Sequence, residues 1–93
     1  MAGGEIKATL PEEFSGEPAD TNRWLLAMGG YFALHKDKYS EEAKTYIFLN
    51  RMPKGRGKAF SESWLSKLLD DKVADSKKTI QKIIESFKAA FSP

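Results

Sequence analysis

The sequence predicts an all-α protein, a small bundle of four main helices preceded by an extended N-terminal arm. Apolar residues recur at helical spacing in four separate segments. Strand-like alternation never runs longer than a few residues, and only EIKATL (residues 5–10) could form a short extended segment. The chain has 93 residues, of which 41% are apolar, enough for the core of one small domain. We expect residues 1–8 to be a flexible leader and residues 9–93 to be the helical domain.

The arm contains a single bulky aromatic residue, Phe14, in the stretch LPEEFSGEP. Pro11 and Pro18 restrict the backbone on either side of it, and Gly16 permits a turn. Phe14 is therefore expected to fold back from the periphery against the first helix, where burial of its ring contributes roughly 2–3 kcal/mol. On this interpretation, Phe14→Ala loosens the arm and leaves the four helices formed.

The first helix is predicted to run from Asp20, its N-cap, to His35 or Lys36. The Asp20 carboxylate can accept hydrogen bonds from the free backbone donors of the first turn. Gly29 and Gly30 lie in the middle of this helix, where each costs roughly 1 kcal/mol relative to alanine. They indicate either a close helix–helix contact or a local bend, and close packing is favoured. The residues at helical spacing are Trp24, Leu25, Met28, Tyr31, Phe32 and His35.

The second helix is predicted to begin after Ser40, whose hydroxyl can cap it. It ends near Met52, because Pro53 disfavours a helical conformation in the residue before it. Its centre, YIFL (residues 46–49), is apolar on every side, which is typical of a central helix covered by its neighbours. The following PKGRGK (residues 53–58) is interpreted as a loop, since it holds one proline and two glycines.

The last two helices are predicted at residues 58–69 and 77–90. Ser76 is expected to cap the fourth. The apolar face of the third is formed by Phe60, Trp64, Leu65, Leu68 and Leu69. The fourth has the clearest amphipathic stripe of the chain, which consists of Ile80, Ile83, Ile84, Phe87 and Phe91.

The residue types needed for catalysis are scarce, so we expect no enzyme, no cofactor and no metal site. There is no cysteine and one histidine, His35. GRGK lacks the Ser or Thr and the preceding strand of a phosphate-binding loop. The acidic pairs stand at adjacent positions, which do not face each other on a helix. No apolar run approaches the roughly 20 residues of a membrane span, and no signal peptide is visible, so no membrane partner is expected.

Charge is spread unevenly along the chain. Residues 1–50 contain 5 basic and 8 acidic residues, and residues 51–93 contain 10 basic and 5 acidic ones. The basic surplus begins with four residues around the predicted loop: Arg51, Lys54, Arg56 and Lys58. This cluster indicates either a solvated turn or a contact to RNA or another polyanion, and the solvated turn is favoured because no helix shows the outward polar residues of a recognition helix.

Several motifs follow one another in a family-specific order. They are LPEEFSGEP, a Trp ten residues after the Phe, a Tyr-Phe pair, YSEEAKTYIFLNRM, a Gly-x-Ala segment before a Trp, and a closing FKAAFSP. In this order they resemble the N-terminal capsid domain of gypsy-type LTR retrotransposon Gag proteins. The resemblance covers residues 9–93 and is carried by Pro11, Phe14, Gly16, Trp24, Lys44, Ile47, Leu49, Gly57, Ala59, Trp64, Phe87 and Phe91.

The resemblance implies a retrotransposon capsid N-terminal-domain-like fold and a non-enzymatic role in self-assembly. Its implied partners are other Gag or capsid subunits, which would form a virus-like shell around RNA, as cytoplasmic, intracellular particles. RNA would be bound mainly by Gag regions outside these residues. The chain also resembles domesticated Gag proteins such as the neuronal Arc protein, whose N-terminal lobe implies the alternative function, a module that binds short hydrophobic peptides in a groove.

Three groups of residues are candidate sites. The groove or core candidates, with core the favoured role for each, are Phe14, Trp24, Met28, Tyr31 and Tyr46. The polyanion candidates are Arg51, Lys54, Arg56 and Lys58. The acidic residues Glu12, Glu13 and Glu17 could form an assembly rim that meets the basic loop of a neighbouring copy.

Overall fold

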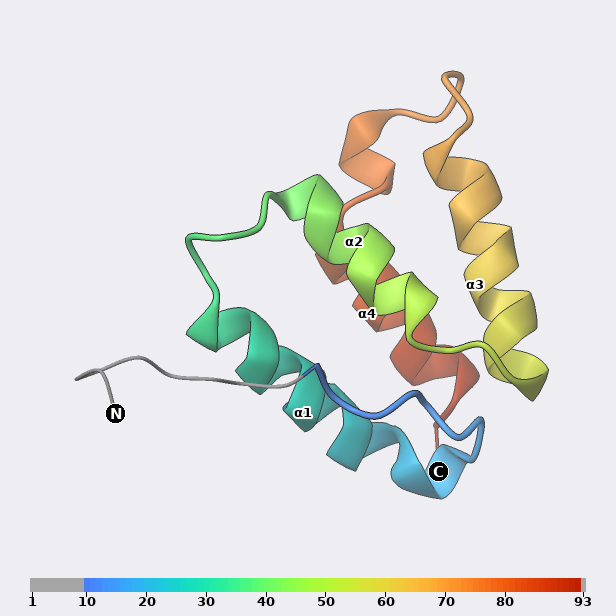
Figure 1. Cartoon of the computed structure of the whole chain (residues 1–93). Helices are drawn as coiled ribbons and strands as arrows, with labels where there is room; N and C mark the ends of the chain where they lie inside the picture. Colours follow the sequence, from blue (N-terminus) through green and yellow to red (C-terminus); the bar gives the residue numbers. More distant parts are fainter. Residues whose placement is uncertain (1–9, 93) are drawn as a thin grey trace.

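The computed structural model describes residues 10–92 and confirms the all-α prediction. Its elements are η1 (Pro18–Asp20), α1 (Thr21–Leu34), α2 (Glu41–Asn50), α3 (Gly55–Leu68), η2 (Asp75–Lys77) and α4 (Ile80–Ala90), where η denotes a 3₁₀ turn. No strand occurs in these residues. The predicted leader, residues 1–8, and nearly all of EIKATL lie outside the described residues. α2 crosses α4 in the centre of the bundle, with α1 and α3 on either side (Figure 1).

One aromatic cluster forms the centre of the core, and Phe87 of α4 is its hub. Five rings lie with their centroids 4.9–5.6 Å from that of Phe87, and they come from the arm and all four helices or their ends: Phe14, Trp24, Phe48, Phe60 and Phe91. Ile83 is fully buried one turn earlier. The predicted stripe of α4 therefore does face the core, and burial of these large side chains supplies most of the favourable free energy.

Phe14 packs against the first helix, as predicted, but it is part of the central core, so its predicted peripheral position is wrong. Its side chain is 1% exposed. Its ring lies 5.3 Å from that of Trp24 and 5.2 Å from that of Phe91, between the first and the last helix. The backbone N–H of Phe14 also donates a hydrogen bond of 2.7 Å to the carbonyl of Arg51, at the end of α2. The arm therefore contributes a side chain to the core and does not lie only on its surface.

The two ends of the domain meet beside the start of α1. The hydroxyl of Thr21 is buried and donates a hydrogen bond of 2.8 Å to the carbonyl of Phe91. This contact joins the first residue of α1 to the residue that follows α4, and Figure 1 shows the C-terminal end next to η1. A buried hydroxyl needs such a partner, so this bond fixes the position of the end of α4 relative to the start of α1.

α3 begins three residues earlier than predicted, so PKGRGK is only partly a loop. Its last four residues form the first turn of α3, where Lys58 N–H donates to the carbonyl of Lys54 at 3.2 Å. Gly55 has a positive φ of 55°, which the absence of a side chain permits. Gly57 is buried against Met52 and Phe14. Gly55 therefore serves the backbone turn at the start of α3 and Gly57 serves close packing, although local sequence rules predict a loop at both positions.

The N-cap of the fourth helix is also displaced. α4 begins at Ile80, and Ser76, the predicted cap, lies in η2. The cap is Thr79, whose hydroxyl accepts a hydrogen bond from the backbone N–H of Lys82 at 3.3 Å. By contrast, the prediction for α2 is confirmed: the hydroxyl of Ser40 accepts from Ala43 N–H at 3.1 Å.

Removal of the Thr79 hydroxyl is expected to lower stability, whereas removal of the Ser76 hydroxyl is not. Thr79→Ala leaves an N–H of the first turn without its acceptor and should cost about 1 kcal/mol. Ser76→Ala is the matched control and should stay within about 0.5 kcal/mol of the parent. Urea denaturation followed by circular dichroism measures both values. A larger loss for Ser76→Ala would contradict the assignment of the cap.

The glycine pair of α1 does not make the predicted close contact. A Cβ atom added to Gly29 or Gly30 would have no atom within 4 Å. α1 nevertheless continues without interruption from Thr21 to Leu34. Each glycine instead leaves open space on its own side of the helix, Gly30 beside Ala27 and Ala33 and Gly29 beside Leu25.

Candidate interaction surfaces

The five predicted groove residues do not line one common groove. Phe14, Trp24 and Met28 are buried in the core, the role favoured for them from sequence. Tyr31 is half-buried, and its hydroxyl lies 2.9 Å from that of Tyr39. Tyr46 is half-buried in a separate depression between α2 and the C-terminal end of α3. The structure thus places three of these residues in the core and the two tyrosines at separate places on the surface.

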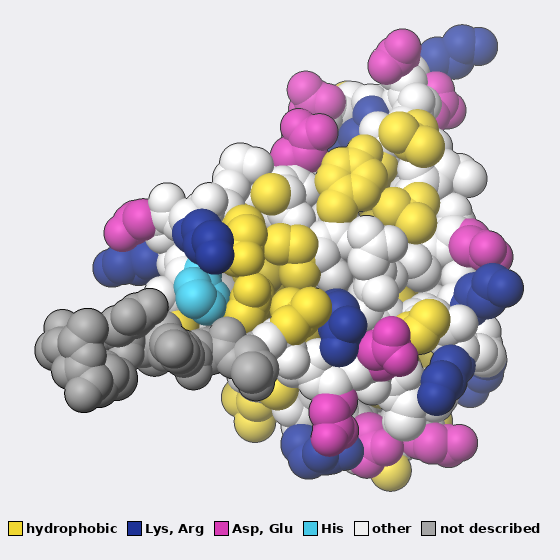
Figure 2. Space-filling model, viewed as in Figure 1, with side chains coloured by type: hydrophobic (Ala, Val, Ile, Leu, Met, Phe, Trp, Pro, Cys, Tyr) yellow, Lys and Arg dark blue, Asp and Glu magenta, His cyan; other side chains and the backbone are white. Residues whose placement is uncertain are grey.

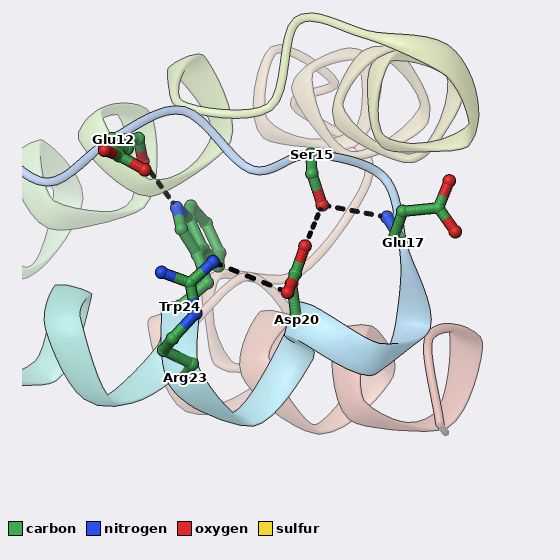
Figure 3. A network of polar contacts seen from close by, with 6 residues as sticks. All are labelled: Glu12, Ser15, Glu17, Asp20, Arg23 and Trp24. Carbon is green, nitrogen blue, oxygen red and sulfur yellow. Dashed lines mark hydrogen bonds and ion pairs between the residues drawn. The ribbon is translucent and has the colours of Figure 1, made fainter.

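A polar network joins the arm to the start of α1 (Figure 3). The indole N–H of Trp24 donates a hydrogen bond of 2.8 Å to the backbone carbonyl of Glu12. The hydroxyl of Ser15 donates to the carboxylate of Asp20 at 2.7 Å and accepts from Glu17 N–H at 3.1 Å. These bonds hold the arm in the path that takes Phe14 into the core.

The side chain of Asp20 was predicted to cap α1. In the structure it holds the arm instead. It stands at the N-cap position, but its carboxylate accepts no backbone hydrogen bond of the first turn. Its two oxygens instead face Ser15 and, at 3.4 Å, the guanidinium of Arg23. The hydrogen bond from Ser15 lowers the pKa of Asp20 below its ordinary value; desolvation opposes this effect and Arg23 assists it.

Ser15→Ala is expected to raise the pKa of Asp20 toward its ordinary value, because the hydrogen bond to the ionised form is lost. Arg23→Gln should raise this pKa by less. A lowered folded-state pKa contributes stability above the unfolded-state pKa, and that contribution is lost as pH falls through the folded-state value. The ¹³C chemical shift of the carboxyl group, followed from pH 7 to 2, measures the change. A larger rise for Arg23→Gln would refute this order of causes.

Two of the four polyanion candidates bind the domain's own backbone. The Arg51 guanidinium is half-buried and donates to the carbonyl of Pro11 in the arm. The guanidinium of Arg56 donates to the carbonyl of Ala90 at 3.1 Å and lies 5.3 Å from the ring centroid of Phe91. Lys54 and Lys58 are exposed at the start of α3. The structure therefore does not gather these four cations on one free loop.

The three acidic rim candidates, Glu12, Glu13 and Glu17, are exposed along the arm. Charges of both signs also alternate around the face shown in Figure 2, without one basic field. Glu12 and Glu13, but not Glu17, line a depression of about 200 Å³ between the arm and α1. Because acids and bases are interspersed on this face, we find no feature of it that favours a polyanion.

An apolar groove that the sequence did not indicate lies between α1, α2 and α4. It has a volume of about 410 Å³. Its apolar lining consists of Leu25, Leu26, Met28, Phe32, Phe48 and Ile84, with Asn22 and Lys88 as its polar members. Leu25 and Phe32 stand at helical spacing with the buried Trp24 and Met28, but both are only half-buried. The neighbouring helices leave Leu25 and Phe32 partly exposed. Periodicity predicts which residues share a side of a helix, but not how far the neighbours cover that side.

The outer side of α1 is a second apolar surface that the sequence analysis missed. Leu26 is 77% and Leu34 is 52% exposed. The shallow surface around them includes Ala27, Gly30 and Ala33. The available signal was the stretch WLLAMGGYFAL (residues 24–34), eleven residues without a charge. Further hydrophobic side chains are exposed beside the single histidine in Figure 2.

No family model, curated protein or solved structure matches this chain. Within residues 10–92, no three side chains of His, Cys, Asp or Glu are grouped so that they could hold a metal ion. In the same part of the chain, no helix has both the length and the apolar character needed to cross a membrane. The protein is a small all-α bundle. Its two apolar surfaces are the features that indicate a function.

Proposed function

We propose that this chain is a non-enzymatic structural domain of a retrotransposon-type Gag or capsid protein, which contributes to self-assembly of a virus-like shell that packages RNA. The proposed partners are other copies of the same protein, and the proposed location is in intracellular, cytoplasmic particles. RNA is bound mainly by Gag regions outside these residues. The observation that carries this proposal is the apolar outer side of α1, where Leu26 and Leu34 remain exposed after the core has formed.

Exposed leucines of this kind fit an assembly domain better than an isolated monomer. A large apolar patch on a soluble protein usually marks an interaction site. In a shell each contact is repeated many times, so that weak individual contacts hold the assembly together. The order of motifs in the sequence supports the same function, because it resembles the capsid N-terminal domain of gypsy-type Gag proteins.

Sedimentation velocity over a wide concentration range tests the assembly function. The chain should be monomeric or weakly associated at micromolar concentration, because one small surface per contact gives low affinity. At several hundred micromolar, species larger than a dimer should appear reversibly, and electron microscopy should show ordered assemblies. A tight, closed oligomer at micromolar concentration contradicts the proposal. So does association that stops at the dimer or does not occur.

The groove between α1 and α4 supports a second candidate function, the binding of a short hydrophobic peptide. Its volume of about 410 Å³ and its apolar lining are in the range of small-ligand pockets. It lies away from the arm, so the ligand would contact Leu25, Phe32 and Ile84, not Phe14. The ε-ammonium of Lys88 at its edge favours a peptide with an acidic residue beside its apolar ones.

NMR chemical-shift mapping with a library of hydrophobic peptides, with and without an acidic residue, tests this candidate. Saturable shifts should be confined to Leu25, Phe32, Ile84 and their neighbours. Ile84→Gln, at a half-buried position, should abolish them, whereas Leu69→Gln is the matched control at an exposed leucine outside the groove. Absence of saturable shifts, or shifts that Ile84→Gln does not change, would exclude the peptide function.

A further inference from the structure

We infer that the site which holds the arm of this domain also accepts the arm of a second copy, so that two copies exchange arms and form a dimer. The arm in question is residues 10–17, the segment before η1, and none of these residues belongs to a helix. Figure 1 shows it crossing the near side of the bundle, from α1 toward the start of α3, with no helix in front of it. The arm thus lies against the helices as a bound, extended peptide does.

The helices bind the arm through its main chain. The guanidinium of Arg51 donates a hydrogen bond to the carbonyl of Pro11. The indole N–H of Trp24 donates one of 2.8 Å to the carbonyl of Glu12. The carbonyl of Arg51 in turn accepts one of 2.7 Å from Phe14 N–H. The groups that bind the arm therefore belong to α1 and to the end of α2, and they can bind the same sequence in a second copy equally well.

One side chain of the arm is its anchor. The centroid of the Phe14 ring lies 5.0–5.3 Å from those of three other rings, which belong to Trp24, Phe87 and Phe91. These three residues stand in α1, in α4 and directly after α4, so the aromatic pocket comes from the helical part of the domain. A depression of about 200 Å³ lies between the arm and α1. Attachment of the arm therefore depends mainly on one buried ring and on main-chain hydrogen bonds.

Residues 15–20 connect the arm to α1, and this connection opens when arms are exchanged. Gly16 forms its turn, with a φ of 89°. The hydroxyl of Ser15 binds the carboxylate of Asp20 and the N–H of Glu17. These contacts within the connection are lost on opening, whereas the contacts between arm and helices form again in the second copy. Six extended residues span at most about 20 Å, so the second copy has to lie beside the start of α1.

Concentration and the connection decide between the two forms, because both contain the same contacts in the arm site. In a single copy the arm is tethered next to its own site, which favours the monomer at micromolar concentration. Exchange becomes favourable where copies are crowded together. Arm exchange uses a different part of the domain from the exposed side of α1, so the inference goes beyond the proposed function and does not rest on it.

Refolding of the 93-residue chain from urea at millimolar concentration tests the exchange. A dimer should form and persist on dilution, because its return to monomer requires the buried Phe14 ring to leave the core. Gly16→Ala and Ser15→Ala should each raise the ratio of dimer to monomer at least about threefold, since alanine disfavours a positive φ and cannot bind Asp20. Ser66→Ala, at an exposed position of α3, is the matched control and should leave the ratio unchanged.

Isotope-filtered NMR identifies the segment that crosses between copies. In an equal mixture of ¹³C-labelled and unlabelled chains, refolded together, intermolecular NOEs should join the Phe14 ring of one copy to the Phe87 and Phe91 rings of the other. Absence of these NOEs in the parent and in both variants of the connection overturns the inference, whether no dimer forms or the dimer uses another surface. A ratio in both variants equal to that of Ser66→Ala contradicts the opening of residues 15–20.

The inference and the proposed function fail separately. If species larger than a dimer form reversibly in sedimentation but all NOEs of Phe14 stay within one copy, the shell function stands and only the exchange is excluded. If the NOEs of Phe14 cross between copies but the chain never exceeds a dimer, the exchange stands and the shell function is excluded.

Discussion

Phe14→Ala is expected to destabilise the whole domain by about 3–5 kcal/mol, the usual cost of removing a buried phenylalanine ring. The ring is 1% exposed and touches the rings of Trp24, Phe87 and Phe91. A small domain is stable by only about 5–15 kcal/mol, so this substitution should remove a large part of its stability.

Urea denaturation measures this loss with two probes, tryptophan fluorescence for the core around Trp24 and far-UV circular dichroism for the helices. The two transitions should coincide and shift together to lower urea. Leu10→Ala is the matched control in the same arm. That side chain is 39% exposed and should cost far less. If Phe14→Ala leaves the stability of the helices unchanged and alters only the fluorescence, then Phe14 lies at the periphery of the domain and not in its core.

Gly57→Val is expected to destabilise the domain by about 1–3 kcal/mol or more through overpacking. A Cβ at this position would lie 3.2 Å from Met52 Cβ and 3.5 Å from Phe14 Cδ2. The two further methyl groups of valine have to displace those buried side chains. A loss of this size lowers the melting temperature by about 4–8 °C for each kcal/mol in a domain of this length.

Gly29→Ala is the matched control, and the opposite sign is expected. Gly29 lies inside α1 with open space where its Cβ would be. Alanine there should raise stability by up to about 1 kcal/mol through helix propensity. Thermal denaturation of both variants provides the comparison. Stabilisation by Gly57→Val, or a loss in Gly29→Ala, would show that the environments of the two glycines are assigned wrongly.

The helices themselves could be predicted because their signals are local. The hydroxyl of Ser40 and the stripe of α4 each depend on residues within a few positions of one another, and both predictions are confirmed. The ends of helices were predicted less well. Gly55 and Gly57 follow a proline and favour a loop locally, but packing of Gly57 against Met52 and Phe14 makes them the first turn of α3.

The candidate sites were harder to predict, because a side chain's role depends on which distant groups it meets. The cations of Arg51 and Arg56 looked alike in the sequence, and each is held by a carbonyl from a remote segment, Pro11 or Ala90. Asp20 was expected to bind backbone donors beside it but binds Ser15 and Arg23. The apolar outer surface of α1 could not be predicted, because it depends on which side of this helix packs against the rest of the domain.

The sequence by itself determined the class of fold, the number and order of the helices, and the face of α4 that is buried, because spacing and capping act within one helix. Only the tertiary structure decided that Phe14 packs against Phe87 and Phe91 at the centre of the core and that Leu26 and Leu34 stay exposed. A helix as uniformly apolar as α1 can bury any of its sides. The side it buries is set by where the neighbouring helices and the arm pack, and this depends on contacts between residues far apart in the chain.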